Sequence, residues 1–231
     1  MPTSGADARR RSYQNKRMKC SVEGCSRRRR MVAAHCSDHG RRLTYFGSTS
    51  GRAIQKQEIA PYVKLARQAI KKLGASQAVV AALDTMRTLL NPGEEPAMPR
   101  PLRMNERWLL WRELLRLHNV TPHEALAATA GVWMYAIRNP RDLPDDARLT
   151  YALGRAVLKL RAFEVVGSHW NDALQREETK YRVLPGLASG LLGRRIRKSL
   201  GVFYLSLARF IDQQHEAALQ RAAALRTPLT A

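Results

Sequence analysis

The sequence of 231 residues contains only three cysteines, and all of them lie between residues 20 and 36. A secreted disulfide framework normally uses an even number of cysteines. The count therefore favours a reducing compartment, where clustered cysteine and histidine side chains bind metal more often than they form disulfides. We expect a cytoplasmic protein, in a bacterial cytosol or on the nucleoid.

Long apolar runs are also missing. No segment reaches the roughly 18 uninterrupted apolar residues of a membrane-spanning helix. The first 17 residues, MPTSGADARRRSYQNKR, have no apolar core of the kind found in secretory signals. These two absences exclude a membrane span and a signal peptide, and we expect no membrane partner.

Acidic residues are scarce, with 19 Asp and Glu against 40 Lys and Arg, so the net charge is +21. Residues 1–56 hold 14 of the basic and three of the acidic side chains, which is about half of that net charge. A strong positive field attracts polyanions such as DNA or RNA, without choosing between them. The uneven distribution favours a basic N-terminal module over a uniformly basic protein.

Catalytic motifs are absent from the sequence. It has no glycine-rich phosphate loop, no H-E-x-x-H and no G-x-S-x-G. An HNH nuclease needs a histidine base, a metal-binding partner and an asparagine on a ββα hairpin, and no such group is visible. We predict that the chain is not an enzyme, with a divergent Mg²⁺-dependent nuclease as the alternative. The histidines outside the N-terminal module are His118, His123, His169 and His215.

The three cysteines do form part of a motif, C-x4-C-x10-C-x2-H, made by Cys20, Cys25, Cys36 and His39. Zinc in structural sites takes four nitrogen or sulfur ligands, and a closed Cys3His set leaves no position for substrate. Cys36 and His39 are three residues apart, so on a helix they share one face. The spacing predicts a treble-clef-like finger with one structural Zn²⁺. His35 is a second candidate ligand beside Cys36, although thiolates dominate such sites.

Residues 18–52 resemble the small Cys3His treble-clef zinc finger of phage proteins, often found beside HNH homing-type endonucleases. The resemblance implies zinc binding and contact with DNA for this part of the chain alone. Arg27 to Arg30 depart from the family, which commonly has Arg-Pro and small residues there. The residues that fit are Cys20, Val22, Gly24, Cys25, Cys36, His39, Arg42, Phe46 and Gly47.

Beyond the finger, apolar residues recur at helical spacing, and the fold class predicted is mainly α, with an all-α multi-helix body. Capping and breaking residues predict helices over 59–73, 77–90, 106–118, 121–138, 145–163, 168–181, 186–199 and 201–225. We expect five parts in the chain: a basic arm that is disordered until bound (1–17), the zinc finger (18–56), a helical hairpin (57–91), a proline-rich linker (92–104) and a helical bundle (105–231).

These features predict a zinc-dependent DNA-binding protein of phage or mobile-element type, which contacts phosphates through Arg and Lys. The alternatives are an RNA-binding protein, or a protein-interaction adaptor with a structural zinc finger. The helical body is expected to form a homodimer or to dock a partner protein. The residues predicted to contact nucleic acid are Arg27, Arg28, Arg29, Arg30, Arg41 and Arg42 in the finger, and Arg194, Arg195, Arg197 and Lys198 in the body.

Overall fold

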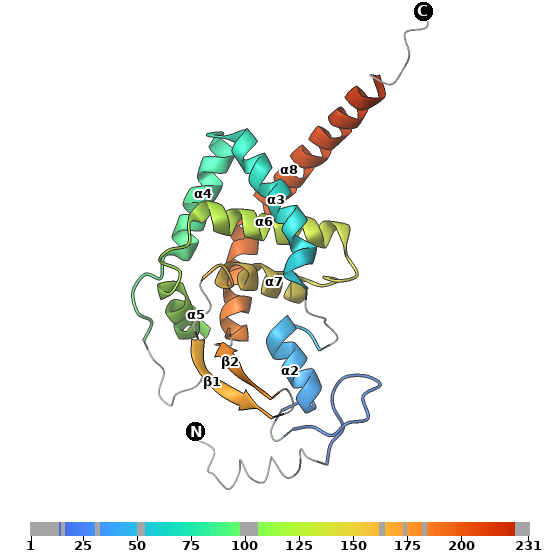
Figure 1. Ribbon diagram of the computed structural model, residues 1–231, viewed down its shortest axis with the longest axis vertical. Helices are drawn as coiled ribbons and strands as arrows, with labels where there is room; N and C mark the ends of the chain where they lie inside the picture. The colour runs from blue at the N-terminus through green and yellow to red at the C-terminus, as the bar shows by residue number, and fades with distance from the viewer. Residues whose placement is uncertain are drawn as a thin grey trace, which may run out of the picture. The chain divides into compact units, whose positions relative to one another are not determined.

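The computed structural model describes residues 14, 17–30, 33–49, 54–97, 106–161, 165–172, 175–181 and 184–224. Backbone contacts divide the chain into two units, Met1–Ala53 and Ile54–Ala231. The described residues contain seven α-helices and one two-stranded sheet (Figure 1). The fold is mainly helical, as predicted, with the Cys3His group preceding the helical body. Of the predicted basic arm, only Gln14 and Arg17 lie within the described residues, and the predicted linker is described as far as residue 97.

The first unit contains a short turn-rich segment followed by helix α2, Ser37–Phe46. An isolated β-bridge joins Lys19 to Arg28, so the chain folds back on itself around the first two cysteines, before the helix begins. Helix α2 ends at Gly47, whose φ of 71° lies in the left-handed region that glycine adopts without strain. Cys36 is the residue immediately before the helix, in agreement with the predicted start.

The second unit is built from six helices and a hairpin. The helices are α3 (Lys56–Leu73), α4 (Gln77–Leu90), α5 (Glu106–Leu115), α6 (Pro122–Arg138), α7 (Asp146–Leu158) and α8 (Gly186–Ala224). The hairpin pairs β1 (Val165–Asn171) with β2 (Arg176–Tyr181) in antiparallel register. No helix in the described part of the chain combines the length and the apolar character that a membrane crossing requires.

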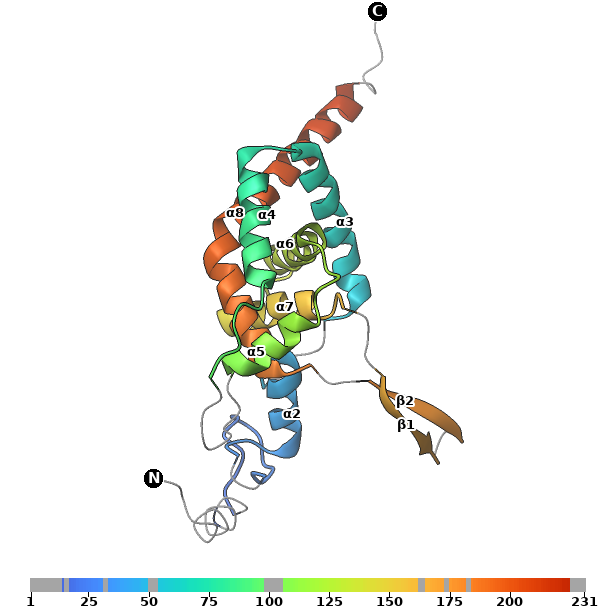
Figure 2. The ribbon, with the colours of Figure 1, turned by 90° about the vertical axis from the view of Figure 1, so that its left-hand side faces the viewer.

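Helix α6 lies at the centre of the helical unit and packs against α3, α4, α7 and α8 (Figure 2). From Ala125 to Val132 every residue is buried, and four of these eight are alanine. Small side chains let neighbouring helices approach closely. A Cβ atom on Gly131 would lie 2.8 Å from the backbone nitrogen of Val63 in α3, so the helix pair needs glycine at this position.

Two sets of polar interactions are buried in the core. Thr129 Oγ1 in α6 and the Tyr204 hydroxyl in α8 lie 2.7 Å apart, and burial raises the pKa of that tyrosine. Glu113 in α5 is fully buried and pairs with two guanidinium groups, from Arg116 at 3.5 Å and Arg161 at 3.4 Å. A buried carboxylate is stable only when such cations compensate its lost hydration. Polar contacts therefore join α6 to α8, and α5 to the residues that follow α7.

One predicted helix is wrong. Residues 168–181 do not form a helix but belong to the β1–β2 hairpin, in which His169 pairs with Glu178 and Trp170 with Glu177. This segment is polar and has no apolar stripe at helical spacing to bury. Its backbone groups are instead satisfied across the hairpin, where Gln175 takes a positive φ of 49° in the turn. Because most of these side chains stay exposed, core burial does not select a helix here.

The break predicted at residues 199–201 is also wrong, because α8 runs without interruption through Gly201. Glycine in a helix interior costs about 1 kcal/mol relative to alanine. Buried Leu200 and Tyr204 on either side anchor this turn to the core, and a Cβ on Gly201 would lie 3.5 Å from the Trp133 ring. Packing therefore outweighs the local preference. Helix α5 also ends earlier than predicted, at Leu115, and α7 ends at Leu158.

Candidate metal centre and basic surface

Cys20, Cys25, Cys36 and His39 converge in the first unit, as the motif predicts. One ligand atom from each residue lies within 4.8 Å of all the others. The His39 Nδ1 atom is 3.3 Å from Cys20 Sγ and 3.5 Å from Cys36 Sγ. Sulfur and nitrogen ligands of tetrahedral zinc, at about 2.3 and 2.0 Å from the ion, lie roughly 3.5 Å apart. The group can hold a metal ion, and its spacing and sulfur-rich donors fit zinc.

Backbone hydrogen bonds hold the first pair of cysteines. The Cys20 N–H donates to the Arg27 carbonyl at 2.8 Å, and the Cys25 N–H donates to the Val22 carbonyl at 3.1 Å. Gly24 takes a positive φ of 73° in this turn, a conformation that glycine adopts without strain. The loop is therefore closed by its own backbone, which places both sulfur atoms on the same side.

Helix α2 supplies the second pair of ligands. Cys36 caps its start and His39 follows within the first turn, so both side chains point toward the same place. The Cys36 N–H also donates to Cys20 Sγ at 3.3 Å. This bond links the helix start directly to the first loop, and its direction favours a negatively charged sulfur on Cys20.

The surroundings of the cysteines shift their pKa values in opposite directions. Burial raises the pKa of the Cys20 thiol, but hydrogen bonds from the Cys36 and Val22 N–H groups and from His39 and His35 bring it down to about 5. The Arg27 N–H lowers the pKa of Cys25, but burial and the neighbouring sulfurs of Cys20 and Cys36 raise it overall. Several thiolates so close together need a cation between them, which a divalent metal supplies. His35 lies outside the four-residue group and instead supports Cys20 through its hydrogen bond.

Few side chains are buried among the residues of the first unit whose burial is described, which leave out 44–46. The buried ones are the two metal-site cysteines, Cys20 and Cys36. Leu43 on α2 is 44% exposed, and Met18 is 49% exposed. A segment of this size with so few buried apolar side chains gains little stabilisation from a hydrophobic core. The Cys3His group is thus the main feature of the described residues that can hold this unit together.

The arginines predicted to contact nucleic acid fall into two groups within the finger. Arg27 forms an ion pair with Asp38, and this contact, followed by Arg41 and Arg42, holds the pKa of the Asp38 carboxyl below its usual value. Arg29 donates to the Lys19 carbonyl at 2.9 Å and to Ser21 Oγ at 3.0 Å. These two guanidinium groups therefore brace the metal-binding loop from its exposed surface.

The second group is free of such contacts. The side chains of Arg28, Arg30 and Arg42 are exposed and have no hydrogen-bond or ion-pair partner among the described residues. Arg41 shares features of both groups: its side chain is 70% exposed, and it lies 3.8 Å from the Asp38 carboxylate. The sequence does not separate these six arginines. It also gives no sign that Asp38 pairs with Arg27, because the two residues are 11 positions apart.

In the helical unit, the four predicted residues lie on one exposed part of α8. Arg197 forms an ion pair with Asp146 of α7 at 2.7 Å, which fastens the two helices. The side chains of Arg194, Arg195 and Lys198 are exposed. Arg197 therefore contributes to the packing of α7 on α8.

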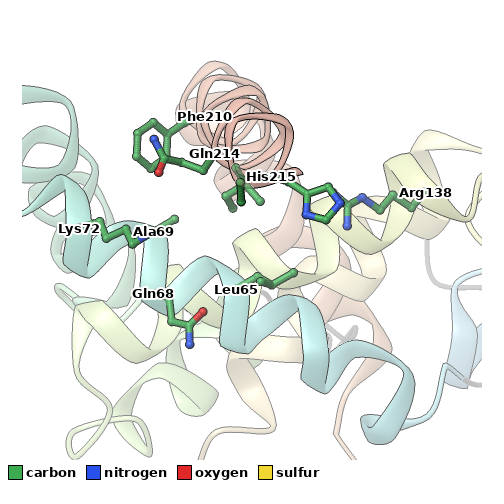
Figure 3. A pocket seen from close by; sticks show the side chains of 10 residues that line it. Leu65, Gln68, Ala69, Lys72, Arg138, Phe210, Gln214 and His215 are labelled. Carbon is green, nitrogen blue, oxygen red and sulfur yellow. The ribbon is translucent and has the colours of Figure 1, made fainter. Parts of the chain in front are cut away.

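A groove in the helical unit is a second candidate site (Figure 3). It has a volume of about 460 Å³ and is formed where α3 and α8 diverge, with Arg138 from α6 at one end. Its lining includes the apolar residues Leu65, Ala69 and Ile211 and the basic residues Lys72 and His215. None of its lining residues is a carboxylate, a thiol or a hydroxyl. Its side chains therefore offer one titratable histidine without an acidic partner, which is not the paired set of a hydrolytic site.

The other histidines lie apart from each other along the described chain. His118 is exposed before α6, and His123 is exposed in the first turn of α6. His169 faces Glu178 across the hairpin, with Nε2 3.9 Å from the carboxylate. The prediction that the chain is not an enzyme stays a prediction.

Comparisons with known proteins give no assignment. No protein-family model, no curated protein and no solved structure matches the chain. The site is therefore interpreted from its own geometry.

Proposed function

We propose that the chain is a DNA-binding protein whose zinc-stabilised first unit contacts the phosphate backbone. The observation that carries this proposal is the set of exposed guanidinium groups of Arg28, Arg30 and Arg42, which have no partner among the described residues. They flank a metal group that fixes the loop and the helix bearing them. A rigid base for arginine side chains reduces the entropy lost on binding phosphate.

The metal serves as a scaffold in this proposal. A closed Cys3His set has no open position for substrate or water, so one structural Zn²⁺ would order the loop and α2 without taking part in chemistry. Arg27 and Arg29 would hold the same loop from its exposed surface. Binding through phosphates alone is largely independent of base sequence.

The test is a titration of labelled random-sequence duplex DNA with the zinc-loaded full chain over a series of salt concentrations. The logarithm of the binding constant should fall steeply with the logarithm of salt, by about 0.9 per phosphate neutralised. Replacing Arg28, Arg30 and Arg42 together by alanine removes three phosphate contacts and should reduce the magnitude of that slope by roughly 2.7. Zinc content should not change.

The matched control is Arg87→Ala, which removes an exposed arginine of the helical unit that already pairs with Asp84. It should leave affinity and slope nearly unchanged. A flat salt response, or equal losses in the triple variant and the control, would contradict the proposal. Tighter binding to a matched RNA duplex or single strand than to DNA would replace DNA by RNA as the ligand.

A further inference from the structure

Helix α8 is 39 residues long and has two opposite sides with different surroundings. At 1.5 Å per residue it extends for about 58 Å. One side packs on the core through Leu192, Ile196, Leu200, Tyr204 and Leu207, all nearly inaccessible to solvent. Figures 1 and 2 both show its C-terminal part continuing past the other helices of the unit. A helix of this length thus presents its other side to solvent along most of its course.

That other side carries a row of residues at helical spacing, three, four or seven positions apart, here called the outer stripe. Val202 in its middle is 81% exposed, and Leu205 one turn later is 46% exposed. Leu219 near the C-terminal end is 57% exposed. Val202 and Leu205 are adjacent on the helix surface, and adjacent exposed apolar residues of this kind indicate an interaction surface. The outer stripe consists of Leu191, Arg194, Lys198, Val202, Leu205, Asp212, Glu216 and Leu219, of which Leu191 is partly buried against the core.

The outer stripe is self-complementary about Leu205. Leu191 precedes Leu205 by 14 residues and Leu219 follows it by 14. Arg194 and Glu216 each lie 11 residues from it, on opposite sides. If a second copy of α8 ran antiparallel with Leu205 facing Leu205, leucine would meet leucine and arginine would meet glutamate.

The other two charged positions obey the same relation, while Val202 would face Ala208, three residues beyond Leu205. Lys198 and Asp212 each lie seven residues from Leu205, so they would also face each other. Each two-fold contact occurs twice, because both copies supply both partners. The dimer would therefore contain four cross-helix ion pairs, with apolar contacts at the centre and toward both ends.

We propose that two copies of the chain associate through antiparallel pairing of their α8 helices along the outer stripe. A two-fold axis passes beside Leu205, and each Arg194 contacts Glu216 of the second copy. The charges fix both register and direction, as polar positions do in coiled coils. Parallel pairing would place Arg194 on Arg194 and Glu216 on Glu216, which is repulsive.

The charge pattern of the outer stripe favours a protein partner over nucleic acid. Asp212 and Glu216 lie in the same row as Arg194 and Lys198, and a polyanion following the helix would meet both carboxylates. Val202 and Leu205 separate the two charged groups and have nothing to offer a phosphate. Asp212 already accepts from Arg138 through Oδ1 at 2.7 Å, and a carboxylate accepts several such bonds.

A reciprocal charge exchange tests the pairing. The wild type should sediment as a dimer of twice the chain mass. Arg194→Glu alone, or Glu216→Arg alone, places like charges opposite each other twice per dimer and should weaken association by about 100-fold or more. The double variant restores both pairs in reversed order and should recover most of the wild-type dimer. Circular dichroism should show unchanged helicity in all three.

Cross-linking tests the position of the axis. In zinc-loaded protein, Leu205→Cys places two thiols at the two-fold axis and should give a disulfide-linked dimer on a non-reducing gel. Ser206→Cys is the matched control, because this exposed neighbour lies off the stripe by about 100° of helix rotation. It should cross-link no more than the wild type.

Three results would overturn the proposal. The first is a wild-type chain that remains monomeric at the highest concentration at which it is soluble. The second is a double charge variant no more dimeric than either single variant. The third is an Arg194→Glu variant that keeps the wild-type mass but loses affinity for DNA, which would make the stripe a nucleic-acid contact instead.

Discussion

Glycine residues decide how closely the helices of the second unit approach. A Cβ atom on Gly154 of α7 would lie only 1.9 Å from the Ser189 carbonyl oxygen of α8. On Gly193 it would lie 1.6 Å from the Thr150 carbonyl oxygen. The two glycines face each other's helix, so α7 and α8 meet backbone to backbone, and no side-chain rotation can relieve a methyl group here.

Gly154→Ala should therefore destabilise the helical unit strongly. Overpacking in a core typically costs 1–3 kcal/mol, and a clash with backbone atoms on a neighbouring helix should reach about 3 kcal/mol or more. Gly190→Ala is the control on α8, because its Cβ would meet nothing closer than Arg194 Nη1 at 3.7 Å. That variant should be neutral, or more stable by up to about 1 kcal/mol. Urea unfolding measures both, and equal effects would show that the close approach is not needed.

Helix starts in this protein were readable from local sequence where a capping motif was present. Thr121 and Glu124 form a capping box at the start of α6, with the Glu124 N–H donating to Thr121 Oγ1 and the Thr121 N–H donating to the Glu124 carboxylate. Gln55 and Glu58 form a second box at α3, which the sequence does not signal because glutamine is not a usual N-cap. That is why α3 starts at Lys56 rather than at residue 59.

The α6 capping box should make stability depend on pH. Hydrogen bonds from the Thr121 backbone and side chain lower the pKa of Glu124 below its usual 4.5. A depressed folded pKa means that the contribution is complete above 4.5 and is lost as pH falls through the lower folded value. The stability difference between wild type and Glu124→Gln should thus shrink as urea unfolding is repeated from neutral pH downward.

The size of the effect is small, because Glu124 is exposed to solvent. Thr121→Ala should cost about 1 kcal/mol at neutral pH. A difference between wild type and Glu124→Gln that stays constant down to the acid limit of folding would contradict the role of the carboxylate.

The two units of the molecule are stabilised by different means. A single cluster of buried apolar residues joins α3, α4, α5, α6, α7 and α8. The described residues of the first unit contribute none to that cluster and rely on the Cys3His group. If two copies pair through α8, each dimer would carry two such first units, and their linkage would raise the apparent affinity for DNA.

Metal removal should therefore unfold one unit and spare the other. Excess chelator should abolish the ordered signals of the first unit in an amide NMR spectrum, since metal binding supplies its folding energy. Far-ultraviolet circular dichroism should fall little, because α2 contributes only ten helical residues and α8 alone has 39. The control is Cys25→Ser, which should give the same partial loss without chelator. Loss of the whole helical circular dichroism signal would show that the folding of both units depends on the metal.

The sequence alone determined the features that depend on near neighbours in the chain. The four metal-site residues lie within 20 positions, and their spacing predicted the group that the structure brings together. Helical periodicity likewise predicted most of the helices, because each amphipathic face repeats locally. Tertiary structure decided the rest. Asp38 selects Arg27 as its partner, the core carries α8 through Gly201, and hairpin pairing displaces a helix at residues 168–181. Each of these outcomes depends on contact energies between residues that are not neighbours in the sequence.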